Sequence, residues 1–481
     1  RNGDDRDRVM RAGTTAIAAS MFRSRRLPVS WRRAAALMLV TGFAAFLLFN
    51  RLGDVRAPIW DEAYYLPSTA RLHEGRVQFA SHPPLGLMLI AAGDALYSGN
   101  GEIDQAPIAA VKSIPAEAMP INYDYLGPRL APAFFGVIGA GLFFLLMSEL
   151  TGSAGAGLML SPLYLCDTAL LTQFRAAHLD PFQIAFALAA LLCLVHGIRK
   201  RGMVWAVGFG FFVACSALVR ANAVMLAPLG LFLLWPPLRA AHRREAVGRI
   251  VAGAGGAVVA AGLVAAAFAW ASPALPDPAT EAGRMDIAWL SPEIIAAGRV
   301  DARDPRAVAA LAGDYARFML ADHEGMARSD TNGSHPWEWM LGQGAVTYRW
   351  DAGEDWVATV ALLPNFAAWL VSLGGVLATL CSLKRGITLL QAALLIGWFA
   401  NMAVLVWLDA SRVLYLYCYF LPLLIGHALA ALAWRGRGLP ERPVLVMLIA
   451  VTTCFLVTAP IAFHWNVPKP YCRALLHDCG R

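Results

Sequence analysis

Charged residues are scarce in this sequence of 481 residues. Only 15% of the residues are Asp, Glu, Lys or Arg, whereas 58% are hydrophobic and the mean hydropathy is +0.53. Soluble proteins carry about 25% charged residues, and a soluble chain of this length would form roughly two to four domains with polar surfaces. The composition therefore argues against a soluble protein and predicts that lipid solvates much of the apolar surface.

The sequence also lacks metal-binding and nucleic-acid-binding patterns. Its eight cysteines form no Cys-x-x-Cys or Cys/His zinc spacing, no His-Glu-x-x-His occurs, and there are no internal repeats. The net charge of +7 sits in short clusters between apolar runs, without a basic-aromatic module. We therefore expect no metal, no cofactor and no nucleic-acid partner.

Long apolar runs dominate what is present. A helix needs about 20 apolar residues to cross the hydrocarbon core, and eleven segments qualify as candidates. The third is rich in glycine, and Arg220-Ala-Asn222 separates the fifth from the sixth, so a single long helix is an alternative there. The candidates are 32–51, 128–149, 154–172, 178–198, 203–219, 222–238, 248–270, 357–380, 387–407, 411–433 and 443–464.

The basic clusters predict the orientation of these spans. With the N-terminus in the cytoplasm, the loops after even-numbered spans should be basic, and they carry Arg or Lys clusters at 199–201, 239–249, 384–385 and 435–442. Two long segments, 53–127 and 271–356, then lie outside the cytoplasm. The second holds fourteen acidic residues against seven Arg and no Lys, with short surface helices expected in stretches such as Arg306–Leu320.

These segments define the expected organisation of a multi-pass protein of the inner (plasma) membrane. Residues 1–31 are a basic cytoplasmic segment with Met10 and Met21 as candidate starts, followed by an uncleaved signal-anchor helix. A first membrane module is expected over 32–270, a second one over 357–464, and an extracytoplasmic tail over 465–481. An oxidising compartment makes Cys472 and Cys479 candidates for a disulfide.

An acidic pair opens the first long segment. Asp61 and Glu62 lie about ten residues beyond the first span, near the membrane surface and among aromatic residues. A desolvated carboxylate has a raised pKa and can take a proton from a hydroxyl. The alternative interpretation is a helix start, where acidic residues are favoured by the helix dipole. The residues alone leave both interpretations open.

A second motif, Ser81-His82-Pro83-Pro84-Leu85-Gly86, follows about twenty residues later. The two prolines fix an extended backbone that can hold His82 in place over the apolar stretch that follows. The alternative is a simple turn before a surface helix.

In combination these motifs resemble the protein O-mannosyltransferase family of the GT-C glycosyltransferases. Asp-Glu soon after the first span, then His-Pro-Pro-Leu-Gly, is similar to the family pattern, and five further stretches follow in the family's order. These are Asn100-Gly101, Arg129 before Phe134-Phe135-Gly136, Gln173-Phe174-Arg175 with Leu179-Asp180, Ser334-His335-Pro336-Trp337 with Trp339, and Tyr417 with Tyr419-Phe420-Leu421-Pro422. The resemblance covers most of residues 55–425 and implies an all-α membrane fold of GT-C type.

The resemblance implies a glycosyltransferase that moves a sugar, mannose in this family, from a polyprenyl- or dolichyl-phosphate donor to Ser/Thr hydroxyls of proteins outside the cytoplasm. Such an inverting displacement needs one base, which the resemblance assigns to Asp61, with Glu62 orienting the acceptor or tuning Asp61. The leaving phosphate needs cations, and arginine contacts phosphate well. The candidate cations are Arg129, Arg175, Arg220 and Arg412.

Each further candidate has a structural alternative. The arginines can instead be interfacial side chains that reach the headgroups. Asp180 either binds substrate or caps a helix before Pro181. His82, His335 and Trp337 are candidates for substrate binding, and the last two can equally serve loop packing.

The chain also departs from the family pattern. Leu87 replaces a frequent Lys, Tyr64-Tyr65 replaces His-Phe, and the second long segment, of about 85 residues, is too short for the β-trefoil (MIR) domain of the eukaryotic enzymes, as in a bacterial form. Two other functions stay open. Tyr65 fits the Asp-Glu-x-x-Tyr pattern of sister enzymes that modify lipid A or other glycolipids. A transporter or flippase would carry ionisable residues in mid-span and two-fold repeats.

Overall fold

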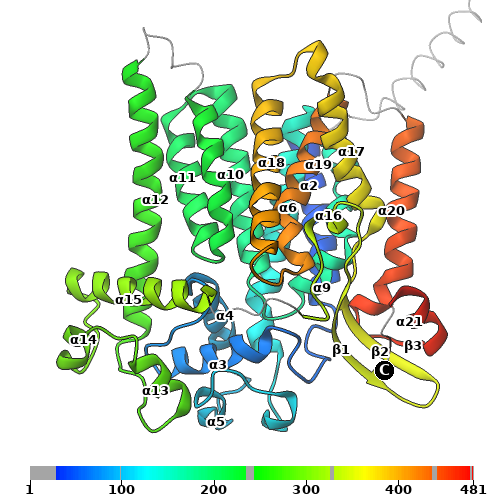
Figure 1. The fold of residues 1–481 in the computed structure, drawn as a ribbon. Helices are drawn as coiled ribbons and strands as arrows, with labels where there is room; N and C mark the ends of the chain where they lie inside the picture. Colours follow the sequence, from blue (N-terminus) through cyan, green and yellow to red (C-terminus); the bar gives the residue numbers. More distant parts are fainter. Residues whose placement is uncertain are drawn as a thin grey trace, which may run out of the picture.

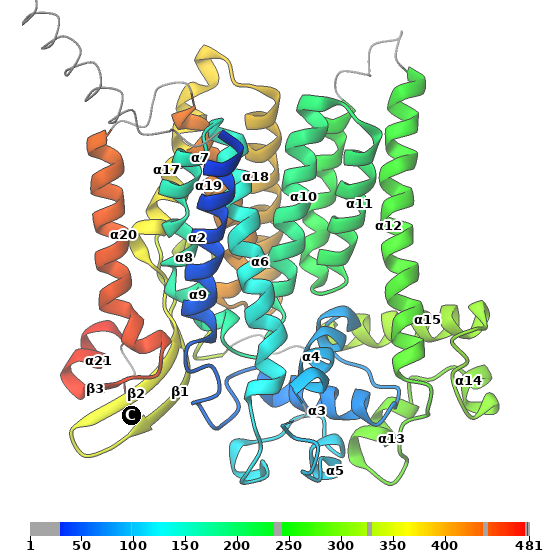
Figure 2. The same ribbon diagram turned by 180° about the vertical axis from the view of Figure 1, so that it is seen from behind.

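The computed structural model describes residues 29–97, 99–234, 243–324, 330–435, 441–476 and 479. Within these ranges eight helical segments are long and apolar enough to cross a membrane. They form a bundle, which Figures 1 and 2 show from opposite sides. The segments are α2 (Val29–Phe49), α6 (Leu126–Thr151), α10 (Asp180–Lys200), α12 (Arg243–Ala271), α17 (Phe366–Ser382) with η5 (Leu383–Arg385), α18 (Leu389–Asp409), α19 (Phe420–Trp434) after η6 (Leu416–Tyr419), and α20 (Glu441–Ala462).

The other three expected spans are shorter or broken helices. The third consists of α7 (Ala154–Leu160), α8 (Pro162–Leu165) and α9 (Thr168–Phe174), with a bend of 68° before α9. The fifth and sixth are α11 (Met203–Ala217) and the 3-10 helix η2 (Ala221–Leu233). All eleven expected segments are therefore helical over much of their length, but only eight described helices, or nine with the bent one, have the length and composition of a full span.

The two breaks have identifiable causes. At the first, the Asp167 carboxylate accepts hydrogen bonds from the backbone N–H groups of Ala169 and Leu170 and so starts a new helix. At the second, Arg220 has an extended backbone (φ −141°, ψ 122°) that separates α11 from η2. The alternative of one long helix through Arg220 is therefore excluded.

A small sheet is the main feature absent from the all-α expectation. The strands β1 (Val346–Ala352), β2 (Trp356–Leu362) and β3 (Asn466–Pro468) pair antiparallel in the order β1-β2-β3. The expected span from residue 357 is therefore corrected: residues 357–362 form a strand, and the helix α17 begins at Phe366. A short apolar run before a helix does not by itself distinguish a buried strand from a helical turn.

The two long segments lie together at one end of the bundle (Figure 1). The first contains α3 (Glu62–His73), α4 (Pro84–Tyr97), α5 (Ala106–Ala109) and η1 (Ala116–Ala118). The second contains α13 (Glu281–Ile287), α14 (Pro292–Ala297), α15 (Pro305–Glu324), α16 (Pro336–Trp339) and β1. The expected surface helix over 306–320 is confirmed as part of α15. The basic connections α10–α11 and α17–α18 lie at the opposite end.

The C-terminal tail lies at the same end as the two long segments, where β3 and α21 (Lys469–Leu475) pack beside β2. Cys472 and Cys479 are joined by a disulfide, so the expected bond is present.

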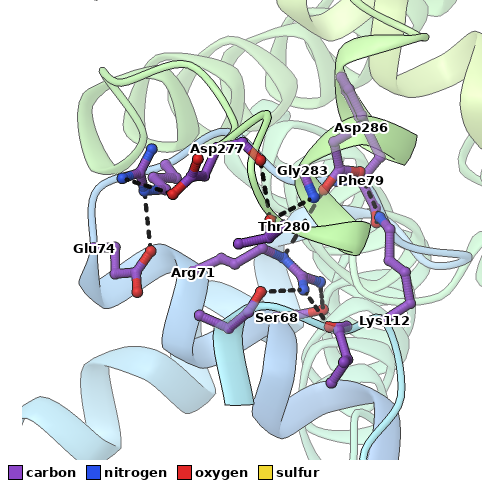
Figure 3. A network of polar contacts seen from close by, with 12 residues as sticks. Ser68, Arg71, Glu74, Phe79, Lys112, Asp277, Thr280, Gly283 and Asp286 are labelled. Carbon is purple, nitrogen blue, oxygen red and sulfur yellow. Dashed lines mark hydrogen bonds and ion pairs between the residues drawn. The ribbon is translucent and has the colours of Figure 1, made fainter. Parts of the chain in front are cut away.

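A buried polar network ties the two long segments to each other (Figure 3). The Lys112 ammonium donates hydrogen bonds to the Asp286 carboxylate on α13 and to the Phe79 carbonyl at 2.8 Å. The Arg71 guanidinium on α3 lies 3.9 Å from the second Asp286 oxygen and donates to the Val111 carbonyl at 2.6 Å. The network fixes the far end of α3, the helix that begins immediately after Asp61.

Candidate active site

Asp61 directly precedes α3 and follows a strained residue. Trp60 has φ +49°, in the left-handed region that bulky residues rarely adopt. Its ring stacks on Tyr348 with centroids 5.2 Å apart and meets Tyr415 edge-on at 5.5 Å. Strain of this kind persists only where surrounding contacts hold it, and it is concentrated at functional sites. The aromatic contacts therefore hold the turn that presents Asp61.

The Asp61 carboxylate does not cap α3, because it accepts no hydrogen bond from a backbone N–H group in the first turn of that helix. Instead it accepts a hydrogen bond from the Tyr65 hydroxyl at 3.1 Å and lies 3.6 Å from the Arg220 guanidinium. Burial raises the pKa of Asp61 above its ordinary value, although the charges of His178 and Arg220 oppose the shift. The side chain is 19% exposed, so a base with a raised pKa faces an accessible space.

Arg220 lies between two carboxylates. Its Nη2 is 3.6 Å from Asp61 Oδ2 and its Nη1 is 3.5 Å from Asp180 Oδ1, while its guanidinium lies 4.8 Å from the centroid of the Tyr417 ring. These distances exceed those of good hydrogen bonds, and among the described residues Arg220 Nε has no hydrogen-bond partner. Its Nη2 also makes a long contact with the Tyr65 hydroxyl, at 3.5 Å. Among the described residues Arg220 therefore has only long contacts, so its Nη donors can turn toward an anion, and phosphate matches a guanidinium well.

Glu62 has a different environment from its neighbour Asp61. Its side chain is fully buried and accepts hydrogen bonds from the backbone N–H groups of Ile59 at 2.8 Å and Ala177 at 2.6 Å. Arg129 binds both of its oxygens, at 2.8 and 2.7 Å. Burial alone would raise the pKa of Glu62, but Arg129 reverses the shift and holds the pKa below its ordinary value. Glu62 is therefore closed off from solvent, and its hydrogen bonds tie the loop before α3 to Arg129 and to Ala177.

The structure revises the assignment of Arg129 to donor phosphate. Besides Glu62, its guanidinium donates to the carbonyls of Val55 and Ala57 at 2.8 and 2.9 Å, and more weakly to that of Leu52 at 3.4 Å. The five N–H groups of the guanidinium are engaged in this way, and the side chain is fully buried. No donor remains for a phosphate.

Arg175 is likewise directed at backbone rather than at the site around Asp61. Its Nη1 donates to the carbonyls of Leu47 and Leu48 at 2.7 and 3.1 Å, at the C-terminal end of α2. Its guanidinium also lies 4.6 Å from the centroid of the Phe463 ring. A cation at a helix C-terminus satisfies free carbonyls and complements the dipole, so this geometry favours a structural role.

His82 lies beside the cations of the site. Its ring centroid is 6.2 Å from that of Tyr65. Burial, together with the positive charges of Arg220, His323 and Arg412, holds the pKa of His82 well below its ordinary value. His82 is therefore neutral at physiological pH, and the interaction with Arg412 places that second arginine within electrostatic range of the site.

His335 and Trp337 form a separate exposed surface. Their rings stack with centroids 4.5 Å apart, and His335 Nδ1 lies 2.8 Å from the Asp409 carboxylate at the end of α18. Roughly half of each side chain is exposed. In the described part of the chain no hydrogen bond or ion pair joins either residue to Asp61, so the structure does not bring them into the same cluster.

Asp180 belongs to the Asp61 cluster, and sequence reasoning missed several of its neighbours. Asp180 Oδ2 accepts a hydrogen bond from Gln173 at 2.6 Å. His178 Nε2 lies 3.0 Å from the Ile59 carbonyl, and Tyr348 reaches the cluster from β1. The position of His178, two residues before Asp180, was a usable signal. Nothing in the sequence around Tyr348 indicates that it contacts this region.

Comparisons with known proteins identify relatives of the chain. The sequence model of the dolichyl-phosphate-mannose-protein mannosyltransferase family matches residues 38–244. A polyprenol-phosphate-mannose–protein mannosyltransferase of Mycolicibacterium smegmatis is 30% identical over 167 residues, which are 33% of this chain and 28% of that protein. Protein O-mannosyl-transferase 1 of Mus musculus is 31% identical over 158 residues, 32% of this chain and 20% of that protein. The chain thus matches less than a third of the length of these curated relatives.

Solved structures show the fold. A structure of the Saccharomyces cerevisiae protein O-mannosyltransferase Pmt1-Pmt2 complex bound to the sugar donor superposes with a TM-score of 0.70, covering 95% of this chain and 93% of that chain at 12% identity. ArnT from Cupriavidus metallidurans bound to undecaprenyl phosphate gives 0.51, covering 88% and 64% at 15% identity. The membrane fold expected from the sequence is confirmed, and so is the resemblance on which that expectation rested.

Proposed function

We propose that this chain transfers mannose from a polyprenyl-phosphate donor to Ser/Thr hydroxyls of proteins, with inversion at the anomeric carbon, because residues 38–244 match the sequence model of the dolichyl-phosphate-mannose-protein mannosyltransferase family. The observation that carries the proposal is the pair of Asp61 and Arg220. A partly exposed carboxylate with a raised pKa lies 3.6 Å from a guanidinium that retains donors. This combination supplies both a base and an anion site.

The chemistry follows from that pair. The acceptor hydroxyl oxygen attacks the anomeric carbon from the face opposite the phosphate, and its proton passes to Asp61. The bond from the anomeric carbon to the phosphate oxygen breaks, and the polyprenyl phosphate leaves with the electron pair. Arg220 and Arg412 offset the charge that develops on the phosphate. His82, neutral beside them, is proposed to contact the donor, and Asp180 to hold Arg220.

The acceptor side is proposed to include the exposed pair His335 and Trp337. Stacked, half-exposed aromatic rings offer a contact surface of low conformational entropy to a polypeptide. His335 contacts Asp409, the last residue of α18, and the C-terminal end of α18 points toward the end of the bundle where the two long segments lie (Figure 1).

We further propose that this end of the bundle faces the outside of the inner (plasma) membrane. The basic connections at the opposite end match the cytoplasmic side of the positive-inside rule. The disulfide between Cys472 and Cys479, at the end that carries the two long segments, fits an oxidising compartment.

The test uses the full chain, purified in detergent, with radiolabelled polyprenyl-phosphate-mannose and a Ser/Thr-containing acceptor peptide. Label should appear on the peptide and be released by alkaline β-elimination. Asp61→Asn should abolish transfer with unchanged expression, whereas Asp301→Asn, on the exposed surface of the second long segment, should retain it. Near wild-type transfer by Asp61→Asn would show that Asp61 is not the base.

A glycolipid acceptor is the second candidate, and the contact between the Tyr65 hydroxyl and Asp61 favours it. Asp61 and Tyr65 are the first and last residues of the Asp-Glu-x-x-Tyr pattern that resembles glycolipid-modifying enzymes, and here their side chains are hydrogen-bonded. The same assay, repeated with membranes that contain lipid A, separates the two acceptors. Label confined to the lipid fraction would support the glycolipid and exclude transfer to Ser/Thr.

A further inference from the structure

A chain of contacts connects the β-hairpin of the second long segment to Asp61. The Tyr348 hydroxyl on β1 donates to Gln173 Oε1 at 2.7 Å, and Gln173 Nε2 donates to Asp180 Oδ2 at 2.6 Å. The other Asp180 oxygen lies 3.5 Å from Arg220, which in turn lies 3.6 Å from Asp61. All members except Asp61 are buried. Five residues from distant parts of the sequence thus form one polar path to the proposed base.

The backbone of β1 directs Tyr348 into this path. In the register of β1 with β2, Thr347 pairs with Ala361 and Arg349 with Val360, so Tyr348 is an extra residue without a partner. A β-bulge of this kind re-aims a side chain and is common beside active sites. The Tyr348 ring is held by stacking on Trp60 at 5.2 Å, the strained residue that precedes Asp61.

The residues of this path determine which group donates and which accepts each hydrogen bond. An ionised Asp180 can only accept, so the Gln173 amide nitrogen must face it. The Gln173 carbonyl oxygen then faces Tyr348, whose hydroxyl must donate. Removing the Tyr348 hydroxyl leaves a buried amide oxygen unsatisfied, which costs free energy and favours rotation of the Gln173 side chain.

We propose that Tyr348 is a positioning residue of the transfer reaction, which acts through Gln173 to hold Asp180 so that Arg220 is shared between Asp180 and Asp61. The proposal depends on the proposed function only in taking Asp61 as the base. With Gln173 in place, one Asp180 oxygen is occupied and the other is available to Arg220. Without it, Asp180 can take Arg220 with both oxygens and draw the cation away from Asp61.

Loss of Arg220 from Asp61 would raise the pKa of Asp61, because a neighbouring cation favours the ionised carboxylate. Burial and the Asp180 charge already act in that direction. The charged or titratable groups whose charges act on Asp61 are His178, Arg220, Asp180, Tyr65, Tyr348, Tyr415 and Tyr417. Tyr348→Phe removes the hydroxyl at the end of the path and keeps the ring that stacks on Trp60.

The first measurement is the pH dependence of kcat/KM for wild type and Tyr348→Phe in the mannose-transfer assay. We expect the acid limb to shift upward by about one pH unit, which lowers kcat/KM about tenfold at pH values below the limb. The KM for donor should rise as well, because Arg220, the proposed phosphate contact, moves toward Asp180 in this variant. A role confined to stability would lower the yield or the melting temperature without moving the limb.

The second measurement does not require sugar transfer. Dicyclohexylcarbodiimide, an apolar reagent, modifies protonated carboxyl groups, and mass spectrometry of the Asp61 peptide gives the extent of modification against pH. The midpoint for Tyr348→Phe should shift upward by the same amount. If wild type transfers no mannose but this shift is found, the proposed function fails while the positioning role stands.

Two further variants make the test decisive. Gln173→Met removes the amide in the middle of the path, so it should give the same shift, and the double variant should shift no more than either single one. Tyr415→Phe is the matched control, because Tyr415 also contacts the Trp60 ring but its hydroxyl makes no hydrogen bond among the described residues. An unshifted Asp61 midpoint in Tyr348→Phe, or additive shifts in the double variant, would overturn the proposal.

Discussion

The adjacent residues Asp61 and Glu62 should respond to the same substitution in opposite ways. Glu62→Gln leaves the Arg129 guanidinium buried without its carboxylate. In wild type each Glu62 carboxylate oxygen accepts a backbone N–H group, one from Ile59 and the other from Ala177. The substitution replaces one of these oxygens by an amide NH₂, which faces that N–H as a second donor. Breaking a buried ion pair from one side costs about 3–5 kcal/mol. In contrast, burial raises the pKa of Asp61 above its ordinary value, so its ionised form adds no net stability at pH 7 and the neutral Asp61→Asn should cost less than about 1 kcal/mol.

The assay is thermal unfolding of the detergent-purified protein at one fixed scan rate, followed by intrinsic tryptophan fluorescence. For a chain of this size the loss at Glu62 corresponds to a decrease of about 3–5 °C in the apparent melting temperature. Asp61→Asn should melt within about 2 °C of wild type while losing transfer activity. The two variants thus separate a positioning carboxylate from a reacting one.

The pH dependence of this difference provides an internal check. Arg129 holds the pKa of Glu62 below its ordinary value despite burial. The stability contributed by a carboxylate with a depressed pKa is present above its unfolded pKa, about 4.3, and is lost as the pH falls through the folded pKa. The gap between wild type and Glu62→Gln should therefore be full at pH 7 and narrow below about pH 4. A Glu62→Gln protein that melts like wild type but is inactive would refute this reasoning and assign Glu62 to the chemistry.

Three further predictions concern pH, charge and topology. The kcat/KM of wild type should fall on acidification at a pH above the ordinary aspartate value of about 4, because burial raises the pKa of Asp61 and the base must be ionised; an acid limb at or below pH 4 would contradict this. Arg220→Gln should raise the KM for donor about tenfold or more, measured by varying the donor concentration, whereas Arg175→Gln should chiefly lower the melting temperature; equal donor KM values in Arg220→Gln and wild type would remove Arg220 from the phosphate site. In intact cells a membrane-impermeant thiol reagent should label Cys472 and Cys479 only after reduction; labelling that requires lysis would place the tail in the cytoplasm.

Many residues of the candidate site could be predicted from the sequence, because they occur in short motifs. Asp61 was indicated by an acidic pair in the loop after the first span, and Asp180 and Arg220 by charged residues at span ends. The structure places all three within one cluster. The sequence did not distinguish Arg220 from Arg129, because both are arginines at span ends. Only the packing shows that the guanidinium N–H groups of Arg129 donate to Glu62 and to backbone carbonyls. The Arg220 guanidinium, in contrast, has N–H groups without a short hydrogen bond among the described residues.

The sequence by itself determined the membrane class, the eleven apolar segments and the resemblance to protein O-mannosyltransferases, because hydropathy, basic clusters and local motifs are properties of neighbouring residues. Tertiary structure alone decided which segments bend, that residues 357–362 pair as a strand, and that Tyr348 reaches Gln173 from a β-bulge. The contact between Tyr348 and Gln173 joins residues 175 positions apart, so no local pattern encodes it. The bend before α9 and the pairing of β1 with β2 involve neighbouring residues, but a short apolar run is compatible with helix and strand alike, so packing decides between them. For the same reason, only the folded chain separates the partly exposed Asp61 from its fully buried neighbour Glu62.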